Sequence, residues 1–364
     1  MKYDYLIVGA GITGAVLAYE LNKIGKKVII VDRRSHIGGN CYTEIDDGIV
    51  IHKYGAHIFH TDQKWVWDYL NKFDLFIPYE HQVKAIYNNK LYDLPFNLNT
   101  YQQIYNRSGK EALVCLEQEL LEYQNLIPNN LEDQALKSVG KSIYKTLIEG
   151  YTEKQWGKAC KELAPEIIKR LPLRMEANNN YFNDKYQGIP VHGYTKIIEN
   201  MLSGIDIKLN YLYTKDSEDI QATTIIYTGS IDEYFNFCLG ELEYRSLKFE
   251  ETRLPFYQYQ KYPVINYTNK EVPYTRIIEH KHFNKVSTKH TIITKEFPIP
   301  YERGGDAYYP INNEHSNNLY NQYLDLANKT NIIFCGRLGS FKYLDIDDAI
   351  IEAFKVLEKL KRSI

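Results

Sequence analysis

The sequence has no long hydrophobic run and almost no net charge. None of its apolar stretches reaches the roughly 20 residues that a helix needs to span a bilayer, so no membrane insertion is expected. The formal net charge of −2 over 364 residues leaves no basic excess, which argues against a nucleic-acid partner. The N-terminus is expected to enter a strand at once, without a signal peptide. These features predict a cytoplasmic protein.

Cysteine is also scarce. Five cysteines are scattered without a C-x-x-C pair or a spacing typical of metal sites: Cys41, Cys115, Cys160, Cys238 and Cys335. An odd, dispersed set is typical of reduced thiols in a cytosolic protein and argues against a disulfide framework. Cys41 follows a glycine-rich segment, and we interpret it as a small buried side chain.

The first forty residues contain the clearest motif. An apolar run at 5–8 leads into Gly-Ala-Gly-Ile-Thr-Gly at 9–14, a helical pattern follows, and a second apolar run at 28–31 ends at Asp32. This is G-x-G-x-x-G between a strand and a helix, with an acidic residue about 20 positions on, as in dinucleotide-binding domains. The helix N-terminus favours phosphate, and Asp32 can accept a hydrogen bond from a ribose hydroxyl. The predicted cofactor-binding residues here are Gly9, Gly11, Thr13, Gly14 and Asp32.

The residues after Asp32 favour FAD over NAD. The segment Arg-Arg-Ser-His-Ile-Gly-Gly-Asn at 33–40 resembles the second fingerprint of flavoproteins of the glutathione-reductase and amine-oxidase type. We therefore expect Arg33, Gly39 and Asn40 at the cofactor. Near the C-terminus, a strand at 332–335 enters a glycine turn and a final amphipathic helix, a segment that commonly closes over the flavin. The sequence has no second strand–G-x-G-x-x-G–helix, so no separate NAD(P)H domain is obvious.

The whole pattern predicts an α/β fold with a Rossmann-like FAD-binding domain, a helical-bundle insert and an antiparallel-sheet insert. Residues 86–94 are expected to form a hairpin, 99–171 several helices, and 242–300 alternating strands. The predicted FAD domain is discontinuous, at 1–85, 195–240 and 328–364. The helical insert with a mobile lid is expected at 97–180. The sheet domain that binds substrate is expected at 86–96 and 241–327.

Tyrosine is abundant, with 33 residues. Tyrosine offers an apolar face and a hydroxyl, which suits a pocket that stacks on uracil or sugar and hydrogen-bonds phosphate. A genome rich in lysine, asparagine and isoleucine codons would raise the total equally well. Only particular tyrosines therefore count as evidence.

Seven short motifs resemble those of bacterial UDP-galactopyranose mutase. They are GAHIFHT at 55–61, GYTEKQWG at 150–157, KRLP at 169–172, NYF at 180–182, VPYTR at 272–276, YYP at 308–310 and YLD at 343–345. The resemblance runs essentially from end to end, and several of these motifs are peculiar to that family. It is therefore far more specific than the dinucleotide fingerprint.

The resemblance implies an isomerase that interconverts UDP-galactopyranose and UDP-galactofuranose, the precursor for galactofuranose in cell-surface polysaccharide. It implies reduced FAD as cofactor, without net redox change. Flavin N5 would attack the anomeric carbon and expel UDP, and the sugar–flavin adduct would open and reclose as the five-membered ring before UDP returns. A homodimer is usual in the family. UDP-galactose is the expected substrate, and some relatives accept UDP-N-acetylgalactosamine, which the motifs do not separate.

The resemblance also assigns substrate residues. Arg170 and Arg276 match two arginines that clamp the diphosphate, a task that suits the charged, planar fork of arginine, and we expect both to be catalytic. Tyr309 and Tyr343 match tyrosines that hydrogen-bond the diphosphate. The matches around uridine and sugar are Tyr151, Thr152, Trp156 and Tyr181, with Tyr181 stacked on uracil. Without the motifs, Arg170 would indicate a charge at a helix C-terminus, and each aromatic residue would indicate core packing.

Two histidines resemble a pair beside the flavin. His57 and His60 are expected to be catalytic and to stabilise the anionic reduced flavin. Their spacing could also suggest a metal pair, but no acidic partner or third ligand accompanies them, so no metal is predicted. His81 stands where the resemblance leads us to expect an asparagine that contacts substrate, which leaves the sugar specificity open. Further residues expected at the FAD are His57, Arg337, Tyr343, Leu344 and Asp345.

Two other functions compete with the mutase. An FAD oxidoreductase of the amine-oxidase or desaturase type would share the first and last motifs. It would not need two arginines and several tyrosines suited to a diphosphate. A non-catalytic FAD-binding protein would not need so dense a set of matched residues.

Overall fold

The chain folds as two compact units. The structure is a computed structural model that describes residues 2–169 and 173–362. Unit 1 comprises Met1–Tyr79, Asp184–Arg245 and Arg303–Ile364, and unit 2 comprises Glu80–Asn183 and Ser246–Glu302. The division into three domains that the sequence predicts stays a proposal beside these two units.

A five-stranded parallel sheet forms the centre of unit 1. Its order is β10-β2-β1-β11-β17, and every neighbouring pair is parallel. Side chains of β1 alternate between two cores, with Tyr5 and Ile7 on one face and Leu6 and Val8 on the other. This arrangement confirms the predicted Rossmann-like α/β class. The strands are β1 (Lys2–Val8), β2 (Val28–Val31), β10 (Asp206–Lys208), β11 (Gln221–Tyr227) and β17 (Ile332–Phe334).

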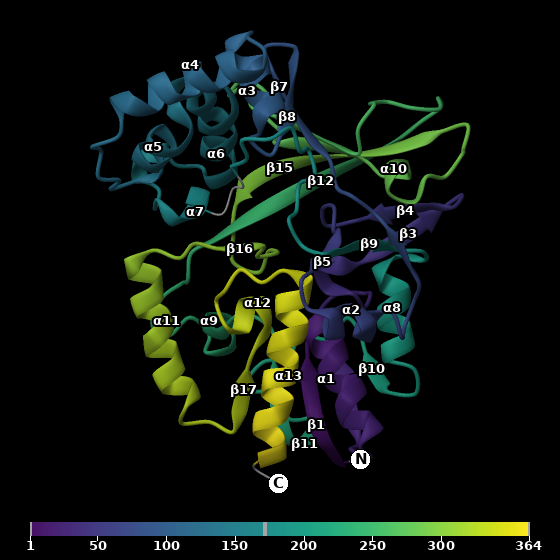
Figure 1. Cartoon of the computed structure of the whole chain (residues 1–364). Helices are drawn as coiled ribbons and strands as arrows, with labels where there is room; N and C mark the ends of the chain where they lie inside the picture. The colour runs from purple at the N-terminus through teal and green to yellow at the C-terminus, as the bar shows by residue number, and fades with distance from the viewer. Residues whose placement is uncertain (1, 170–172, 363–364) are drawn as a thin grey trace. The chain divides into compact units, whose positions relative to one another are not determined.

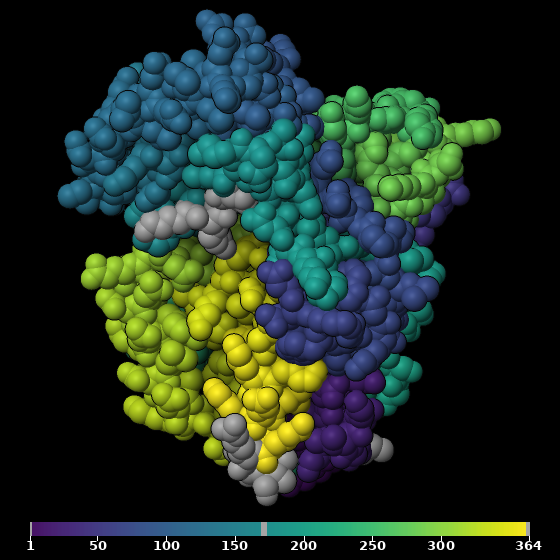
Figure 2. Space-filling view, viewed as in Figure 1, coloured from purple at the N-terminus to yellow at the C-terminus, as the bar shows by residue number. Residues whose placement is uncertain are grey.

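Helices cover both faces of this sheet. One face packs against residues from α1 (Ile12–Lys23), α8 (Gly193–Met201) and α13 (Ile346–Arg362). Helices α1 and α13 lie side by side (Figure 1). Figure 2 shows the C-terminal segment in yellow against the N-terminal segment in purple. The other face is aromatic, and there Tyr234 makes edge contacts with both Tyr227 and Phe334. There α11 (Glu314–Ala327) packs against α9 (Ile231–Tyr234).

Smaller elements complete unit 1. A hairpin pairs β3 (Thr43–Asp46) with β4 (Ile49–His52), and a three-stranded sheet has the order β5-β9-β6. Strand β12 (Tyr244–Leu254) begins in unit 1, where its first two residues pair with β16 (Tyr309–Pro310). The remaining elements are β5 (Phe59–Thr61), β6 (Phe76–Pro78), β9 (Tyr186–Pro190), α2 (Lys64–Leu70), α12 (Gly336–Gly339) and a 3₁₀ turn at Gly39–Cys41.

Unit 2 combines a sheet with a group of helices. Its strands follow the order β12-β15-β14-β13-β7-β8, in which β7 and β13 form a parallel pair. The hairpin of β7 (Val83–Tyr87) and β8 (Lys90–Leu94) turns at Asn88 and Asn89, both with positive φ, as a two-residue primed turn requires. This confirms the predicted hairpin. The other strands are β13 (Val264–Tyr267), β14 (Arg276–Glu279) and β15 (Thr291–Pro300).

The helices of unit 2 share one core with the hairpin. Buried side chains from α3, α4 and α5 meet Ala85 and Tyr92 of β7 and β8. Within the described residues, no helix combines the length and apolarity that crossing a bilayer would need. The helical elements are α3 (Leu98–Tyr105), α4 (Gly109–Glu122), α5 (Leu131–Ile143), a π turn at Tyr144–Ile148, α6 (Glu149–Trp156), a 3₁₀ turn at Cys160–Glu162, α7 (Glu166–Lys169) and α10 (Lys281–Asn284).

Candidate active site

In the glycine loop of unit 1, neighbouring segments lie so close together that no side chain fits at two of the glycines. Gly9 has φ +106°, and a Cβ on it would lie 2.0 Å from the hydroxyl oxygen of Thr228. A Cβ on Gly14 would lie 1.9 Å from the carbonyl oxygen of Gly9, so α1 can approach the strand only without a side chain there. Gly11 is the N-cap of α1 and provides no side-chain hydrogen bond. The first N–H groups of the helix are therefore available to an anion.

Asp32 is held in place by two backbone donors. Its Oδ2 accepts a hydrogen bond from the N–H of Ala10 at 2.7 Å, and its Oδ1 accepts one from the N–H of Arg34 at 2.8 Å. The side chain is 8% exposed. Each carboxylate oxygen keeps a second lone pair, which fits a ribose hydroxyl.

The second glycine segment packs directly on the first. The N–H of Gly38 donates to the carbonyl of Ala10 at 2.8 Å, and Gly39 has φ +53°. A Cβ on Gly39 would lie 2.9 Å from the Cα of Gly11, closer than real Cβ contacts. The Gly-Gly pair is therefore needed to bring Asn40 to the loop, where its Oδ1 accepts from Arg34 at 3.1 Å.

An acidic residue that the sequence motifs do not include joins this region. Asp306 Oδ1 lies 2.9 Å from Arg34 and 3.1 Å from Arg33. Burial raises the pKa of Asp306, but the guanidinium groups of Arg34 and Arg33 together outweigh it and hold the pKa below its usual range. No local motif surrounds Asp306, so only the fold could reveal its pairing with residues about 270 positions away.

The C-terminal residues of unit 1 form a second group. Arg337 donates to the carbonyl of Leu344 at 2.6 Å, and its guanidinium lies 4.8 Å from the ring centroid of Tyr343. The rings of Tyr309 and Tyr343 stack with centroids 5.9 Å apart. Asp345 directly precedes α13. The two tyrosines and the arginine that the sequence predicts at cofactor and substrate therefore lie together.

The two predicted histidines have different partners. His57 Nδ1 lies 2.8 Å from the carbonyl oxygen of Gly55, while His60 Nδ1 lies 2.8 Å from the carboxylate of Asp184. With Nδ1–H donated to the carboxylate, the neutral ring of His60 has its acceptor at Nε2. No sequence motif pointed to Asp184.

Thr13 is 6% exposed at the start of α1. Among the described residues no cluster of three His, Cys, Asp or Glu side chains is arranged to hold a metal.

In unit 2, Arg276 is held from two sides. Its Nη2 donates to the hydroxyl of Tyr151 on α6 at 2.8 Å, and its Nε lies 3.2 Å from a carboxylate oxygen of Glu296. Glu296 faces Arg276 directly across the β14–β15 pair and is 2% exposed. Burial raises the pKa of Glu296, and it raises the pKa of Tyr151 to about 12, with Arg276 acting in the opposite direction on both. No local pattern in the sequence pointed to Glu296.

The GYTEKQWG motif docks α6 on the sheet. A Cβ on Gly150 would lie 2.2 Å from the carbonyl oxygen of Thr268, so only glycine allows this approach. Lys154 donates from Nζ to the carbonyls of Tyr267, Val272 and Tyr274 at 2.7 to 3.0 Å. Burial lowers its pKa to about 8. The motif thus fixes the position of Tyr151 over Arg276.

Trp156 and Thr152 lie on the same helix. Trp156 packs against the helical core of unit 2, the ordinary place for a large aromatic side chain, and Thr152 is half-buried. Both residues therefore lie on the same helix as Tyr151.

His81 and Tyr181 are neighbours in unit 2. The N–H of Tyr181 donates to the carbonyl of His81 at 2.7 Å, and the two ring centroids are 5.7 Å apart. Phe182 stacks on His81 at 5.8 Å. Arg170 and Pro172 lie outside the described residues.

Comparison with known proteins agrees with these motifs. The sequence model of the family described as UDP-galactopyranose mutase matches residues 146–343, and that of an NAD(P)-binding Rossmann-like domain matches residues 7–73. The chain is 39% identical to a probable UDP-galactopyranose mutase of Klebsiella pneumoniae, over 99% of this chain and 95% of that protein.

One further protein is similar to the chain in sequence, and one solved structure is similar to it in fold. A dTDP-fucopyranose mutase of Escherichia coli is also 39% identical, over 96% of each chain. A crystal structure of reduced UDP-galactopyranose mutase has a TM-score of 0.82 at 14% identity, over all of this chain and 95% of that one. At that identity the structural match supports the fold alone.

Proposed function

The chain belongs to the UDP-galactopyranose mutase family, and from this premise we propose that it is an isomerase that interconverts UDP-galactopyranose and UDP-galactofuranose. The observation that carries the proposal is the identity with the Klebsiella pneumoniae protein over nearly the full length of both chains. An oxidoreductase of the amine-oxidase type would have no use for the supported arginine of unit 2.

FAD is the proposed cofactor, and the residues of unit 1 fit it. Within the described part of the chain, the two glycine segments expose backbone that no side chain covers, and no side chain caps the N-terminus of α1, so its N–H groups can bind phosphate. The carboxylate of Asp32 is held in place by hydrogen bonds. Bound in its reduced form, FAD supplies the nucleophile for the anomeric carbon. The proposed FAD-binding residues are Gly9, Gly11, Thr13, Gly14, Asp32, Arg33, Gly39, Asn40, His57, Arg337, Tyr343, Leu344 and Asp345.

The remaining site residues are proposed to act on the substrate. Arg276, kept charged beside Glu296 and Tyr151, binds the diphosphate and stabilises the negative charge on departing UDP, together with Arg170. His60, oriented by Asp184, donates or accepts a proton beside the cofactor. The residues proposed to hold the diphosphate, uridine and sugar are Tyr151, Thr152, Trp156, Tyr181, Tyr309, Tyr343 and His81.

A second substrate follows from one of the relatives. The dTDP-fucopyranose mutase of Escherichia coli is as similar to this chain as the Klebsiella pneumoniae protein is. A dTDP sugar carries the same diphosphate, so the arginine would serve either substrate. The alternative function is therefore the same ring contraction on dTDP-fucose.

We also propose a localisation and an assembly for the protein. The five free cysteines agree with a reducing cytoplasm, where nucleotide sugars are available. A homodimer is the assembly that the family resemblance suggests. Sedimentation velocity of the purified protein would test it.

The function is tested by product analysis. The yellow protein is incubated with UDP-galactofuranose or with dTDP-fucofuranose, with and without dithionite, and the products are separated by HPLC. We expect UDP-galactopyranose only under reduction and without stoichiometric oxidation of the flavin. Faster conversion of the dTDP sugar would select the alternative function. No conversion of either sugar by a protein with bound, reducible FAD would refute both.

A further inference from the structure

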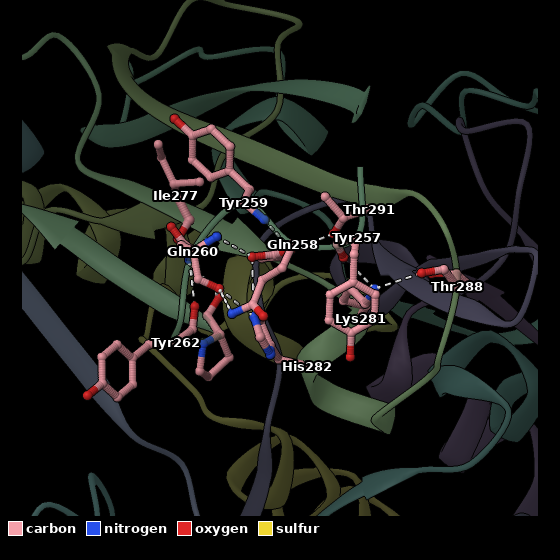
Figure 3. Close-up of polar contacts among 12 residues, drawn as sticks. Tyr257, Gln258, Tyr259, Gln260, Tyr262, Ile277, Lys281, His282, Thr288 and Thr291 are labelled. Carbon is pink, nitrogen blue, oxygen red and sulfur yellow. Dashed lines mark hydrogen bonds and ion pairs between the residues drawn. The ribbon is translucent and has the colours of Figure 1, made fainter. Parts of the chain in front are cut away.

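Unit 2 carries an aromatic and basic surface that the proposed function does not use. The segment between β12 and β13 exposes Phe256, Tyr257 and Tyr259 at 44%, 58% and 44%. One exposed aromatic ring is ordinary, but three within four residues form a cluster. Figure 3 shows the ring of Tyr259 directed away from the polar contacts around Gln258 and Gln260.

The charge around these rings has one sign. Segments 253–263 and 280–291 contain five lysines and arginines and no aspartate or glutamate, in a chain whose net charge is −2. The two segments meet, because Arg253 lies 3.2 Å from His290 and Lys281 donates to the carbonyl of Tyr257. Lys261, Lys285 and Lys289 are exposed. The nearest acidic side chains along these segments are the exposed Glu250 and Glu251 on β12 and the buried Glu279.

A buried network fixes the loop that bears the rings. Glu279, which is fully buried, accepts hydrogen bonds from the N–H groups of Tyr259 and Gln260 at 2.9 and 2.7 Å and from the hydroxyl of Thr291 at 2.6 Å. Burial raises the pKa of Glu279, but the hydrogen bonds from His282, Thr291 and the two backbone N–H groups together outweigh it and hold the pKa below its usual value. The carboxylate therefore stays ionised and keeps these hydrogen bonds.

Two further side chains support the same loop. Gln260 donates from its amide to the carbonyls of Tyr262 and Ile277 at 2.8 and 3.1 Å. Lys281 donates to the carbonyl of Tyr257 at 2.6 Å and lies 3.8 Å from the centroid of its ring (Figure 3). Because the loop is already ordered, a partner that binds the rings does not have to meet the entropic cost of ordering it.

We propose that this surface, comprising Arg253, Phe256, Tyr257, Tyr259, Lys261, Lys285, Lys289 and His290, docks the protein reversibly on an anionic lipid bilayer. Tyrosine rings favour the headgroup region, and lysines bury their stems there while their ammonium groups contact phosphate. The four cationic side chains Arg253, Lys261, Lys285 and Lys289, with no carboxylate in their own two segments, complement anionic headgroups. Leu254, Pro255 and Phe256 add apolar area without hydrogen-bonding groups, which a bilayer buries better than a nucleic acid or an acidic protein would.

The test is co-sedimentation of the full-length, FAD-loaded protein with vesicles. One set contains phosphatidylglycerol and phosphatidylcholine, and the other contains phosphatidylcholine alone. We expect binding only to the anionic vesicles, and release as ionic strength rises. The triple variant Lys261→Glu, Lys285→Glu, Lys289→Glu should lower the partition coefficient about 100-fold. The variant Phe256→Ser, Tyr259→Ser should lower it about tenfold.

Matched controls come from the helical part of the same unit, including the connection between α4 and α5. Lys110→Glu, Lys141→Glu, Lys161→Glu makes the same change in net charge at exposed lysines, and Leu121→Ser, Ile127→Ser removes two side chains that are 60% and 78% exposed. Leu121→Ser, Ile127→Ser should bind anionic vesicles within about twofold of wild type. Lys110→Glu, Lys141→Glu, Lys161→Glu shifts the formal net charge by about −6, as the surface variant does, and should lower the partition coefficient much less than that variant, because its lysines are not part of the surface. Thermal melts show whether each variant is folded.

Three results would overturn the proposal. The first is that wild type does not bind anionic vesicles. The second is that the matched controls lose as much vesicle binding as the surface variants do. The third is that the triple Lys→Glu variant binds vesicles normally but has lost self-association or DNA binding. Turnover of the sugar nucleotide in free solution is unaffected in every variant if the surface only docks the protein. Failure of docking is therefore distinguishable from failure of the proposed mutase function.

Discussion

The candidate binding site of unit 1 depends on close backbone packing, whereas that of unit 2 depends on contacts between side chains. In unit 1, Gly9, Gly14 and Gly39 bring backbone segments so close that no Cβ fits. In unit 2, Tyr151, Arg276 and Glu296 meet as side chains from α6, β14 and β15. A site made of backbone fails when atoms are added, because the chain itself must move. A site made of side chains fails when a charge is lost, because its neighbours stay in place.

Adding one methyl group to the backbone site should have the largest effect. Gly14→Ala places a Cβ 1.9 Å from the carbonyl oxygen of Gly9, which forces α1 away from β1. We expect a loss of about 3 kcal/mol or more in the free energy of unfolding, and purified protein without yellow colour. Urea denaturation and the flavin absorbance measure both effects.

Gly25→Ala is the matched control in the same unit. Gly25 follows the same helix with φ +79°, and a Cβ on it would meet no other atom within 4 Å. The substitution should cost only about 1 kcal/mol, from the left-handed backbone, and retain FAD. Yellow, stable Gly14→Ala protein would contradict the backbone account of this site.

Removing the charge from the side-chain site should abolish turnover and spare the fold. Arg276→Ala removes the guanidinium between Tyr151 and Glu296, and we expect turnover to fall about a thousandfold or more, with an unchanged flavin spectrum. Initial rates with UDP-galactofuranose under dithionite measure the loss.

Arg276→Lys separates charge from shape. Lysine keeps the positive charge beside buried Glu296 but cannot contact Glu296 and Tyr151 with a planar fork, so it should restore less than about a tenth of the activity. Full activity in Arg276→Ala would refute the proposed diphosphate clamp. An altered flavin spectrum in that variant would show that the change disturbs more than the arginine.

The same contrast explains what the sequence could predict. The loop at 9–14, Asp32 and the strand at 28–31 form one continuous segment, so spacing alone indicated their arrangement. The hairpin at 83–94 was predictable because Asn88 and Asn89 tolerate the positive φ that its turn requires. Local sequence determines geometry in both cases.

The unpredicted residues are those whose partners are distant. Glu296 faces Arg276 only because β14 and β15 pair in one register, and Asp306 meets Arg33 and Arg34 only after the chain returns to unit 1. Single carboxylates in ordinary segments carry no local signal of this kind. Family motifs pointed to Arg276 and Tyr151, but they did not indicate what supports them.

Lys154 tests whether the support of the side-chain site matters for stability. Lys154→Met leaves the carbonyls of Tyr267, Val272 and Tyr274 without this donor, and we expect a loss of about 1 to 3 kcal/mol in the free energy of unfolding. Lys161→Met changes an exposed lysine nearby in the sequence and should cost less than about 0.5 kcal/mol. Equal losses in the two variants would show that the three contacts do not stabilise unit 2.

The same lysine predicts a pH dependence. Its pKa is lowered by burial from 10.5 to about 8, so between these values the unfolded chain binds more protons at this position than the folded chain does. The contribution of Lys154 therefore rises with pH through this window and is lost as pH falls through 8. The stability of wild type relative to Lys154→Met should increase between pH 8 and pH 10. A constant difference would contradict the lowered pKa.

Asp306 should give the smallest effect, because its contacts are partly exposed. Asp306→Asn removes the carboxylate that pairs with Arg33 and Arg34, and we expect a loss of at most about 1 kcal/mol at neutral pH. Because the arginines hold its pKa below the usual range, Asp306 contributes stability above its unfolded pKa, near 4, and that contribution is lost as pH falls through its lower folded pKa. Thermal melts at pH 7 and at acid pH measure the difference from wild type.

Asp219→Asn is the matched control, because Asp219 pairs with Lys208 at 2.7 Å on the surface of the same unit and touches neither glycine segment. Both variants should lose little stability, but only Asp306→Asn should weaken FAD binding, since Asp306, unlike Asp219, pairs with the two arginines that follow Asp32. Fluorescence titration of the apoprotein with FAD distinguishes them. Equal affinity in the two variants would mean that backbone geometry, without the charge of Asp306, determines FAD binding in unit 1. The cofactor site of unit 1 would then depend on backbone alone, whereas the site of unit 2 depends on side chains.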